Sequence, residues 1–212
     1  MDAPTLAKTP TIHLHQGDLP AGLAFPNGVA IDSETQGLNL TRDRLCLVQL
    51  SGGDGVCHLV QIARGQTAAP NLKALCEDPK VVKMFHYARF DVAALRKGLG
   101  IDCAPVYCTK IVSKLVRTYT DGHGLKDLVR ELLGVELDKE QQSSDWARGD
   151  LSPQQLAYAA NDVLYLHDLK ARLDAMLERE GRGALAQACF DFLAHRVSLD
   201  LAGWGEVDIF RH

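Results

Sequence analysis

Short apolar segments separated by polar turns dominate the first third of the chain. Gly28–Asp32, Leu45–Leu50 and Val56–Ile62 are each rich in aliphatic residues, as buried strands are. The S-G-G-D-G sequence at 51–55 has the composition of a hairpin turn. A weaker alternation in T-I-H-L-H at 11–15 indicates an edge strand. We therefore expect an antiparallel meander of three strands, preceded by an edge strand.

The pattern then changes to helices that alternate with short strands. Ser152-Pro153 predicts the start of a long helix, because an N-cap hydroxyl precedes a proline at the first helical position. A meander followed by alternating strands and helices predicts one α/β domain with a mixed sheet over residues 11–212, after a flexible tail at 1–10. The expected helices cover 70–76, 90–99, 109–117, 125–133, 153–180 and 184–193, and the further strands cover 81–85 and 106–108.

Composition fits a soluble globular protein. The 212 residues are 46% hydrophobic and 24% charged, with six cysteines and no C-x-x-C pair, which favours reduced thiols and a cytoplasmic location. No apolar run is long enough to span a membrane, and the N-terminus lacks a secretory signal pattern. The net charge of -4 argues against a dedicated binder of long nucleic acid. Residues 109–130 are locally basic and either face phosphates or form a solvated helical face.

Two carboxylates stand at the end of the first core strand. Asp32 and Glu34 follow the apolar run 29–31, with only Ser33 between them. Residues two apart on a strand share a face, so these side chains lie side by side. Neighbouring carboxylates repel and resist burial, and a hard divalent cation relieves both penalties. The alternative is a strand that ends in an acidic turn.

Two further acids occupy comparable positions. Asp91 lies at the junction of a buried strand and the next helix, where α/β domains bind ligands, although an N-cap role is the alternative. Asp162 is four residues after Tyr158, which places both side chains on one helical face. Aspartate is unfavourable inside a helix and needs a partner, either a metal or a surface salt bridge.

Four converging carboxylates would require cations. Two Mg²⁺ or Mn²⁺ ions would balance their charge, and such a pair serves phosphoryl displacement. One ion lowers the pKa of an attacking water and the other stabilises the leaving oxygen. A neighbouring tyrosine can orient that water or help to deprotonate it.

The order D-x-E, an aspartate after an H-x-x-x-F segment, and Y-x-x-x-D resembles the DEDDy group of 3′→5′ exonucleases. This resemblance implies an RNase H-like fold with a mixed five-stranded sheet flanked by helices. It also implies that the four acids hold two divalent ions and that the tyrosine positions the nucleophilic water. The residues that carry these catalytic roles over are Asp32, Glu34, Asp91, Tyr158 and Asp162.

Within that group the segments L-K-D-L-V-R-E-L-L-G-V and K-E-Q-Q-S-S-D-W resemble ribonuclease D. Ribonuclease D continues into C-terminal helical RNA-binding domains, whereas this sequence ends at His212. H-Q-G-D-L-P, R-D-R-L-C-L-V-Q-L-S and L-D-L-A-G-W-G-E-V-D-I-F are more similar to the short nano-RNase C enzymes of alphaproteobacteria. That similarity implies degradation of dinucleotides and short RNAs to mononucleotides, and a ring-shaped homo-octamer. The apolar tail around Trp204 and Phe210 fits an interface or docks on its own domain.

The resemblance also suggests substrate-binding residues. Leu38, just past the first motif, is expected to wedge or stack against terminal bases, with a core position as the alternative. His86 and Arg89 flank the second motif and are expected to contact phosphate, unless the histidine is structural. The other candidates are Lys139, Gln142 and Trp146, which are expected to line the substrate channel, and Tyr119 and His123, which are expected to meet the 5′ end. For Trp146 the alternative is a core position.

Three functions are consistent with these features. The first is a metal-dependent exoribonuclease acting on dinucleotides and short oligoribonucleotides. The second is an exonuclease acting on longer RNA 3′ ends or on DNA. The third is an inactive nucleic-acid-binding scaffold. The presence of all four carboxylates and of the tyrosine argues against this third function.

Overall fold

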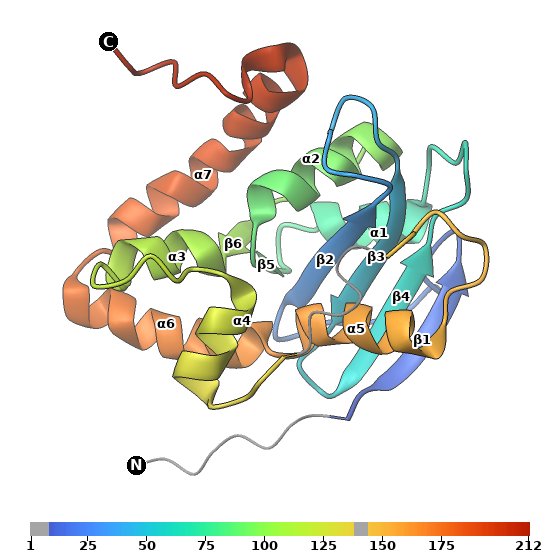
Figure 1. The fold of residues 1–212 in the computed structure, drawn as a ribbon, viewed down its shortest axis with the longest axis horizontal. Coiled ribbons are helices and arrows are strands. Elements are labelled where there is room, and N and C mark those ends of the chain that lie inside the picture. Colours follow the sequence, from blue (N-terminus) through green and yellow to red (C-terminus); the bar gives the residue numbers. More distant parts are fainter. Residues whose placement is uncertain (1–8, 138–143) are drawn as a thin grey trace.

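A single mixed sheet with helices on both faces organises the computed structural model, which describes residues 9–137 and 144–212 (Figure 1). The strand order is β1-β4-β3-β2-β5-β6. Strands β2, β3 and β4 pair antiparallel, which confirms the predicted meander. Strands β5 and β6 continue the sheet in parallel from β2. The strands are β1 (Thr11–Gln16), β2 (Val29–Thr35), β3 (Leu45–Ser51), β4 (Val56–Gln61), β5 (Lys83–Phe85) and β6 (Val106–Cys108).

The described sheet has six strands, whereas the resemblance implied five. The additional strand is the edge strand β1, which pairs parallel with β4 over its whole length. The mixed α/β architecture itself is confirmed.

Strand β2 is longer than the prediction that ended it at Asp32. Ser33 and Glu34 continue the antiparallel ladder, opposite Val48 and Leu47 of β3. The register shifts only between Glu34 and Thr35. The acids therefore lie within a paired strand, because β3 supplies backbone partners that the local sequence of β2 does not reveal.

Helix α5 covers one face of the meander, and α1 and α2 lie on the other (Figure 1). The helix predicted to run from residue 153 to the break at Gly181 is two helices, which meet at Tyr165. The last predicted helix is longer than expected and ends at Leu199. The helical elements are α1 (Pro70–Glu77), α2 (Ala88–Leu99), α3 (Thr109–Val116), α4 (Leu125–Leu128), the π-helical turn η1 (Val129–Leu133), α5 (Pro153–Leu164), α6 (Leu166–Glu180), α7 (Gly183–Leu199) and the π-helical turn η2 (Asp200–Trp204).

The start of α5 is fixed by its own sequence. The Ser152 hydroxyl accepts a hydrogen bond from the Gln155 backbone N–H at 3.2 Å, and the Gln155 side chain accepts one from the Ser152 backbone. This reciprocal capping box, together with Pro153, sets the phase of the helix. Ala159, Ala160 and Val163 then face the core, and Tyr158 and Asp162 on the other side of the helix face the cleft.

All six cysteines are free thiols, five of them buried. Among the described residues, no helix is both long enough and apolar enough to cross a membrane.

Candidate active site

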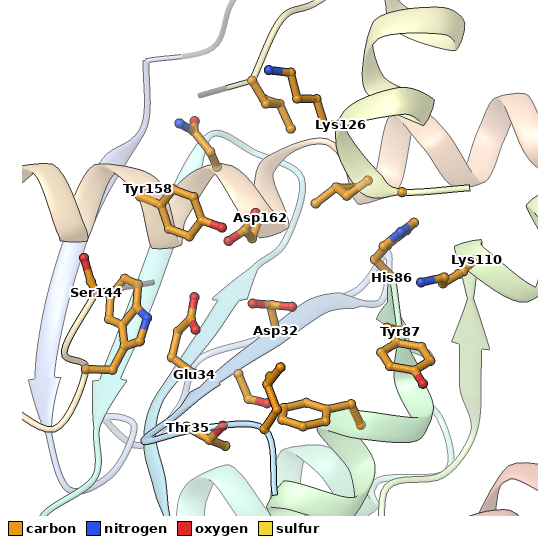
Figure 2. A pocket seen from close by; sticks show the side chains of 18 of the residues that line it. Asp32, Glu34, Thr35, His86, Tyr87, Lys110, Lys126, Ser144, Tyr158 and Asp162 are labelled. Atoms are coloured by element: carbon orange, nitrogen blue, oxygen red, sulfur yellow. The ribbon is translucent and has the colours of Figure 1, made fainter. Parts of the chain in front are cut away.

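Three carboxylates from two elements meet at one point above β2. Asp32 and Glu34 project from β2, and Asp162 projects from α5, which crosses that face (Figure 2). One carboxylate oxygen from each lies within 4.8 Å of those of the other two. All three side chains are partly exposed, so the group is open to small ligands. The prediction that these acids converge is confirmed by this geometry.

Asp91 approaches the same group from α2. It lies in the first turn of that helix and is 3% exposed, whereas the N-cap position is Tyr87, so the N-cap alternative is wrong. Its Oδ1 accepts a hydrogen bond from the Ser33 hydroxyl at 2.6 Å. Asp91 is not among the residues that line the cleft.

Burial raises the pKa of all four acids, and repulsion by neighbouring carboxylates adds to it for Asp32, Glu34 and Asp162. Desolvation is the largest cause in each, and it raises the pKa of Asp91 and Asp162 to about 7. The pKa of Glu34 rises to about 9, with the charges of Asp162 and Asp91 as further causes. The pKa of Asp32 is also raised well above its usual range, by burial and then by the other three carboxylates. Four acids that resist ionisation without a counter-charge fit a site for divalent cations.

Tyr158 stands beside the acids on the cleft side of α5, one turn before Asp162 (Figure 2). Its ring packs against Trp146, with centroids 6.0 Å apart and planes tilted by 38°. Trp146 is 3% exposed and lines the cleft. Trp146 is therefore a buried wall of the cleft that supports the tyrosine ring.

The acids lie in a cleft of about 600 Å³ between the sheet, α5 and the start of α4. Its far side carries positive and imidazole groups, with His86 and Lys110 beyond Asp32 (Figure 2). The Lys110 Nζ stacks 4.5 Å from the centroid of the Tyr87 ring. The cleft thus joins an acidic end to a basic end, as a phosphodiester substrate with a second phosphate would require.

His86 combines a fixed ring with one open nitrogen. Its Nδ1 lies 2.9 Å from the Thr109 hydroxyl, and its buried Nε2 has no hydrogen-bond partner among the described residues. Burial, and then the charge of Lys110, lower the pKa of His86 to about 3. The ring is therefore neutral at physiological pH.

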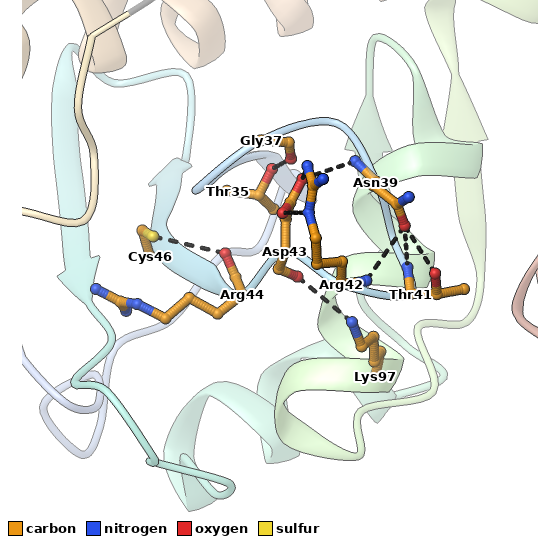
Figure 3. A network of polar contacts seen from close by, with 9 residues as sticks. All are labelled: Thr35, Gly37, Asn39, Thr41, Arg42, Asp43, Arg44, Cys46 and Lys97. Carbon is orange, nitrogen blue, oxygen red and sulfur yellow. Dashed lines mark hydrogen bonds and ion pairs between the residues drawn. The ribbon is translucent and has the colours of Figure 1, made fainter.

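Leu38 lies at the mouth of the cleft and is 87% exposed, so the alternative of a core leucine is wrong. The loop that carries it is closed by a dense polar network (Figure 3). The Asp43 carboxylate accepts hydrogen bonds from the Asn39 backbone N–H at 2.9 Å and from the Arg42 guanidinium at 2.6 Å. The side-chain oxygen of Asn39 accepts three more hydrogen bonds, from the backbone N–H and the hydroxyl of Thr41 and from the backbone N–H of Arg42. A large apolar side chain is thus held in solvent by a loop whose own polar groups are satisfied.

Several substrate-binding candidates lie away from the cleft. Arg89 donates to the Asp200 carboxylate at 2.6 and 2.7 Å, and the structure does not bring it to the acids. Tyr119 is 70% exposed and lies against Arg117, outside the cleft lining. His123 is engaged with the Ser113 hydroxyl at 2.8 Å and is also outside the lining. Lys139 and Gln142 fall outside the described residues.

Sequence reasoning missed other residues of this site. Gln49, fully buried on β3, is the register partner of Asp32 and reaches its Oδ2 at 3.4 Å. The sheet register, which a sequence pattern does not specify, brings it there. Lys110 lies in the locally basic stretch, and that charge was the signal from which it could have been found. The other cleft residues that were not singled out include Ser33, Tyr87, Phe90, Lys126, Ser144 and Asn161.

Comparison with known proteins agrees with this geometry. Residues 20–178 match the model of a 3′-5′ exonuclease family. The structure of Brucella melitensis NrnC bound to pGG is 55% identical in sequence, with a TM-score of 0.92 over 96% of this chain and 100% of that one. The Mg²⁺-bound structure of the same protein has 55% identity and a TM-score of 0.91 over 95% and 99%.

Longer relatives share the same region. Ribonuclease D of Gluconacetobacter diazotrophicus is 40% identical over 154 residues, which are 73% of this chain. The chain spans only 39% of the length of that ribonuclease D. The match to NrnC, in contrast, extends over both chains almost completely. The chain therefore belongs to the 3′-5′ exonuclease family and, within it, is similar to NrnC over nearly its whole length.

Proposed function

We propose that the protein hydrolyses dinucleotides and short oligoribonucleotides from their 3′ ends and releases nucleoside 5′-monophosphates. The observation that carries this proposal is the group of three carboxylates within 4.8 Å of one another beside Tyr158. The pGG ligand in the structure of Brucella NrnC supports a dinucleotide substrate for a chain this similar.

The acids are suited to hold two divalent cations, Mg²⁺ or Mn²⁺. Asp32, Glu34 and Asp162 would supply oxygen ligands on the open side, and Asp91 on the buried side. Oxygen-only donors match hard cations, and their raised pKa values indicate an environment that lacks positive charge. When bound, such a pair supplies an activated water and charge stabilisation at the leaving oxygen.

The protein's own groups arrange the reactants. Tyr158 is placed to orient the nucleophilic water next to Glu34, with Trp146 holding its ring. Ser33 and Gln49 orient Asp91 and Asp32 through hydrogen bonds. Because these partners lie on β2 and β3, the positions of the acids depend on the register of the sheet.

The size and charge of the cleft favour short substrates. A cavity of about 600 Å³ accommodates a small ligand, and Lys110, Lys126 and His86 are among the residues that line it. The two lysine side chains offer a terminal phosphate its counter-charge, while the neutral His86 ring offers a polar edge. Leu38 at the mouth presents an apolar surface to a base.

We also propose that the protein acts in the cytoplasm as a homo-oligomer, with an octameric ring as the expected assembly. The C-terminal segment supports self-association, because its apolar side chains are exposed in the single chain. Trp204, Val207, Ile209 and Phe210 are between 47% and 78% exposed. Such a segment fits an interface better than it fits a free surface.

A comparison of substrates tests the proposal. The purified enzyme is given a 5′-labelled dinucleotide, a 20-nucleotide RNA and a duplex DNA, each with Mg²⁺ or Mn²⁺. We expect the dinucleotide to be cleaved fastest, and chelation to abolish cleavage. Accumulation of uncut dinucleotide while the longer strands shorten would instead assign the protein to longer RNA ends or to DNA. Asp91→Asn serves as the inactive control.

A further inference from the structure

Three histidines form a cluster on strands β1 and β4, which β3 separates from the acids of β2. His13 and His15 lie two residues apart on β1 and so share one face of the sheet. His58 on β4 is the register partner of His13. The three rings lie nearly parallel, with centroids 5.3 to 6.4 Å apart and interplanar angles of 18° to 24°.

Two of these rings already bring their nitrogens together. The His15 Nε2 lies 3.0 Å from the His58 Nδ1. Two imidazole ligands of one tetrahedral Zn²⁺ ion, with bonds of 2.0 to 2.1 Å, would be roughly 3.3 Å apart. The backbone spacing therefore suits shared coordination. The His13 ring stacks on both neighbours, and it would have to rotate about its side-chain bonds to bring a nitrogen within 4.8 Å of the other two.

The surroundings cover one side of the cluster and leave the other side open to an ion. Neutral imidazole is the ligand form of histidine. The Phe25 ring contacts His58 edge-on at 6.3 Å and shields one side of the cluster, while His13 remains exposed to solvent.

We propose that His13, His15 and His58 form a binding site for a borderline divalent cation such as Zn²⁺. Two ligands at positions i and i+2 of one strand and a third on the neighbouring strand converge on a single face. Imidazole nitrogens prefer Zn²⁺, Ni²⁺ or Cu²⁺, whereas the oxygen ligands of the active site prefer Mg²⁺ or Mn²⁺. The chain thus carries two sites of different ion preference. An ion at the histidine site joins the edge strand β1 to β4.

The test separates this site from the acids. Glu34→Gln and Asp162→Asn are combined to remove metal binding by the carboxylates, and the double variant is titrated with Zn²⁺ by calorimetry and with Co²⁺ by visible absorption. We expect one equivalent to bind, with the strong absorption bands of four-coordinate Co²⁺. Adding His15→Gln or His58→Gln should weaken binding at least 100-fold, and His13→Gln should weaken it less. His195→Gln, which changes a histidine outside the cluster, is the matched control.

A measurement on the wild-type protein guards against misfolding of these variants. With the acids saturated by Mg²⁺, the ring signals of the three histidines are followed by NMR as Zn²⁺ is added. We expect all three to change together and to saturate at one equivalent, and the thermal midpoint to rise with Zn²⁺. Unchanged ring signals would overturn the proposal, as would Zn²⁺ binding that is the same with and without His15 and His58.

Discussion

At the scale of single residues, the active-site acids oppose folding when no cation is present. An acid whose pKa is raised by folding is ionised in the unfolded chain at a pH where the native site still holds its proton. For Asp91 and Asp162, native stability is therefore lost as the pH rises from about 4 to about 7. Glu34 extends that loss toward about 9.

Asp162→Asn is thus expected to stabilise the metal-free protein. The amide removes a charge that burial disfavours, so the thermal midpoint in chelator at pH 8 should rise by a few degrees, at roughly 2–4 °C per kcal/mol. The gain should vanish near pH 4, where the carboxylate of the wild type is protonated in both states. Melting curves of the two proteins across this range check the prediction. A lower midpoint for the variant at pH 8 would mean that Asp162 has a stabilising partner.

The same pKa values predict that cations compete with protons. Because Asp91 and Asp162 hold protons below about pH 7, Mg²⁺ affinity should increase as the pH rises from 6 to 9 and should then level off. Calorimetry in buffers of different ionisation enthalpy measures both the affinity and the protons released. Binding that releases no proton at pH 7 would contradict the proposed ligands.

Tyr158→Phe isolates the contribution of one hydroxyl. The ring still packs against Trp146, so substrate binding should persist while water orientation is lost. We expect kcat to fall by about 10²–10⁴-fold with a small change in KM. Single-turnover hydrolysis of a dinucleotide gives both values. A variant with full kcat would exclude the hydroxyl from the reaction.

At the scale of elements, the Leu38 loop between β2 and β3 is built around a glycine. A Cβ added at Gly37 would lie 2.4 Å from the Asp43 Oδ2, so no larger residue fits without moving that carboxylate. The Thr35 hydroxyl also donates to the Gly37 carbonyl, and the Gln36 backbone N–H donates to the Arg44 carbonyl at 3.0 Å. These contacts hold the loop in the shape that exposes Leu38 (Figure 3).

Gly37→Ala should therefore weaken substrate binding indirectly, through the position of Leu38, and not through a contact between the new methyl group and the substrate. Displacement of Asp43 breaks its bond to Asn39, and Leu38 loses its position at the cleft. We expect a rise in KM of about 10-fold, similar to that of Leu38→Ala, with little change in kcat (1.4 kcal/mol per tenfold). Gly149→Ala is the matched control, because an added Cβ there meets no atom within 4 Å. If the effects of Gly37→Ala and Leu38→Ala simply add in the double variant, the loop does not act through Leu38.

At the scale of the whole molecule, the sequence predicts most of the architecture because local patterns specify it. Apolar runs identify the strands, and the capping residues at Ser152 identify α5. Strand alternation places Asp32 and Glu34 on one face, and helix periodicity places Asp162 on the same face as Tyr158. The packing of α5 on β2 then brings the three acids together. Cross-strand partners such as Gln49 depend on sheet register, which no local pattern encodes. The engagement of Arg89 by Asp200 likewise joins residues more than a hundred positions apart, so the sequence alone could not show it.

That long-range contact ties the C-terminal turn to the active site. Asp200 has a side chain only 5% exposed and lies between two arginines, Arg89 of α2 and Arg196 of α7. Arg89 also donates to the Gly205 carbonyl at 2.7 Å. Since Arg89 is two residues before Asp91 on the same helix, the ion pair fixes the end of α2 that carries a candidate metal ligand.

Asp200→Asn should consequently impair stability and activity together. The amide leaves two arginines short of a counter-charge, one of them largely buried, so we expect a loss of about 2 kcal/mol or more in the free energy of unfolding. A less firmly held Asp91 should also shift the Mg²⁺ activation curve to higher concentration. A purely global loss of stability would leave that curve unchanged at temperatures far below the melting temperature. Denaturant melts and Mg²⁺ titrations of dinucleotide cleavage measure the two effects.

Asp102→Asn is the control. It removes the exposed partner of Arg96 and should change neither the free energy of unfolding nor the Mg²⁺ dependence, because a surface ion pair contributes little. An unchanged Mg²⁺ dependence in a destabilised Asp200→Asn protein would confine the role of this ion pair to folding.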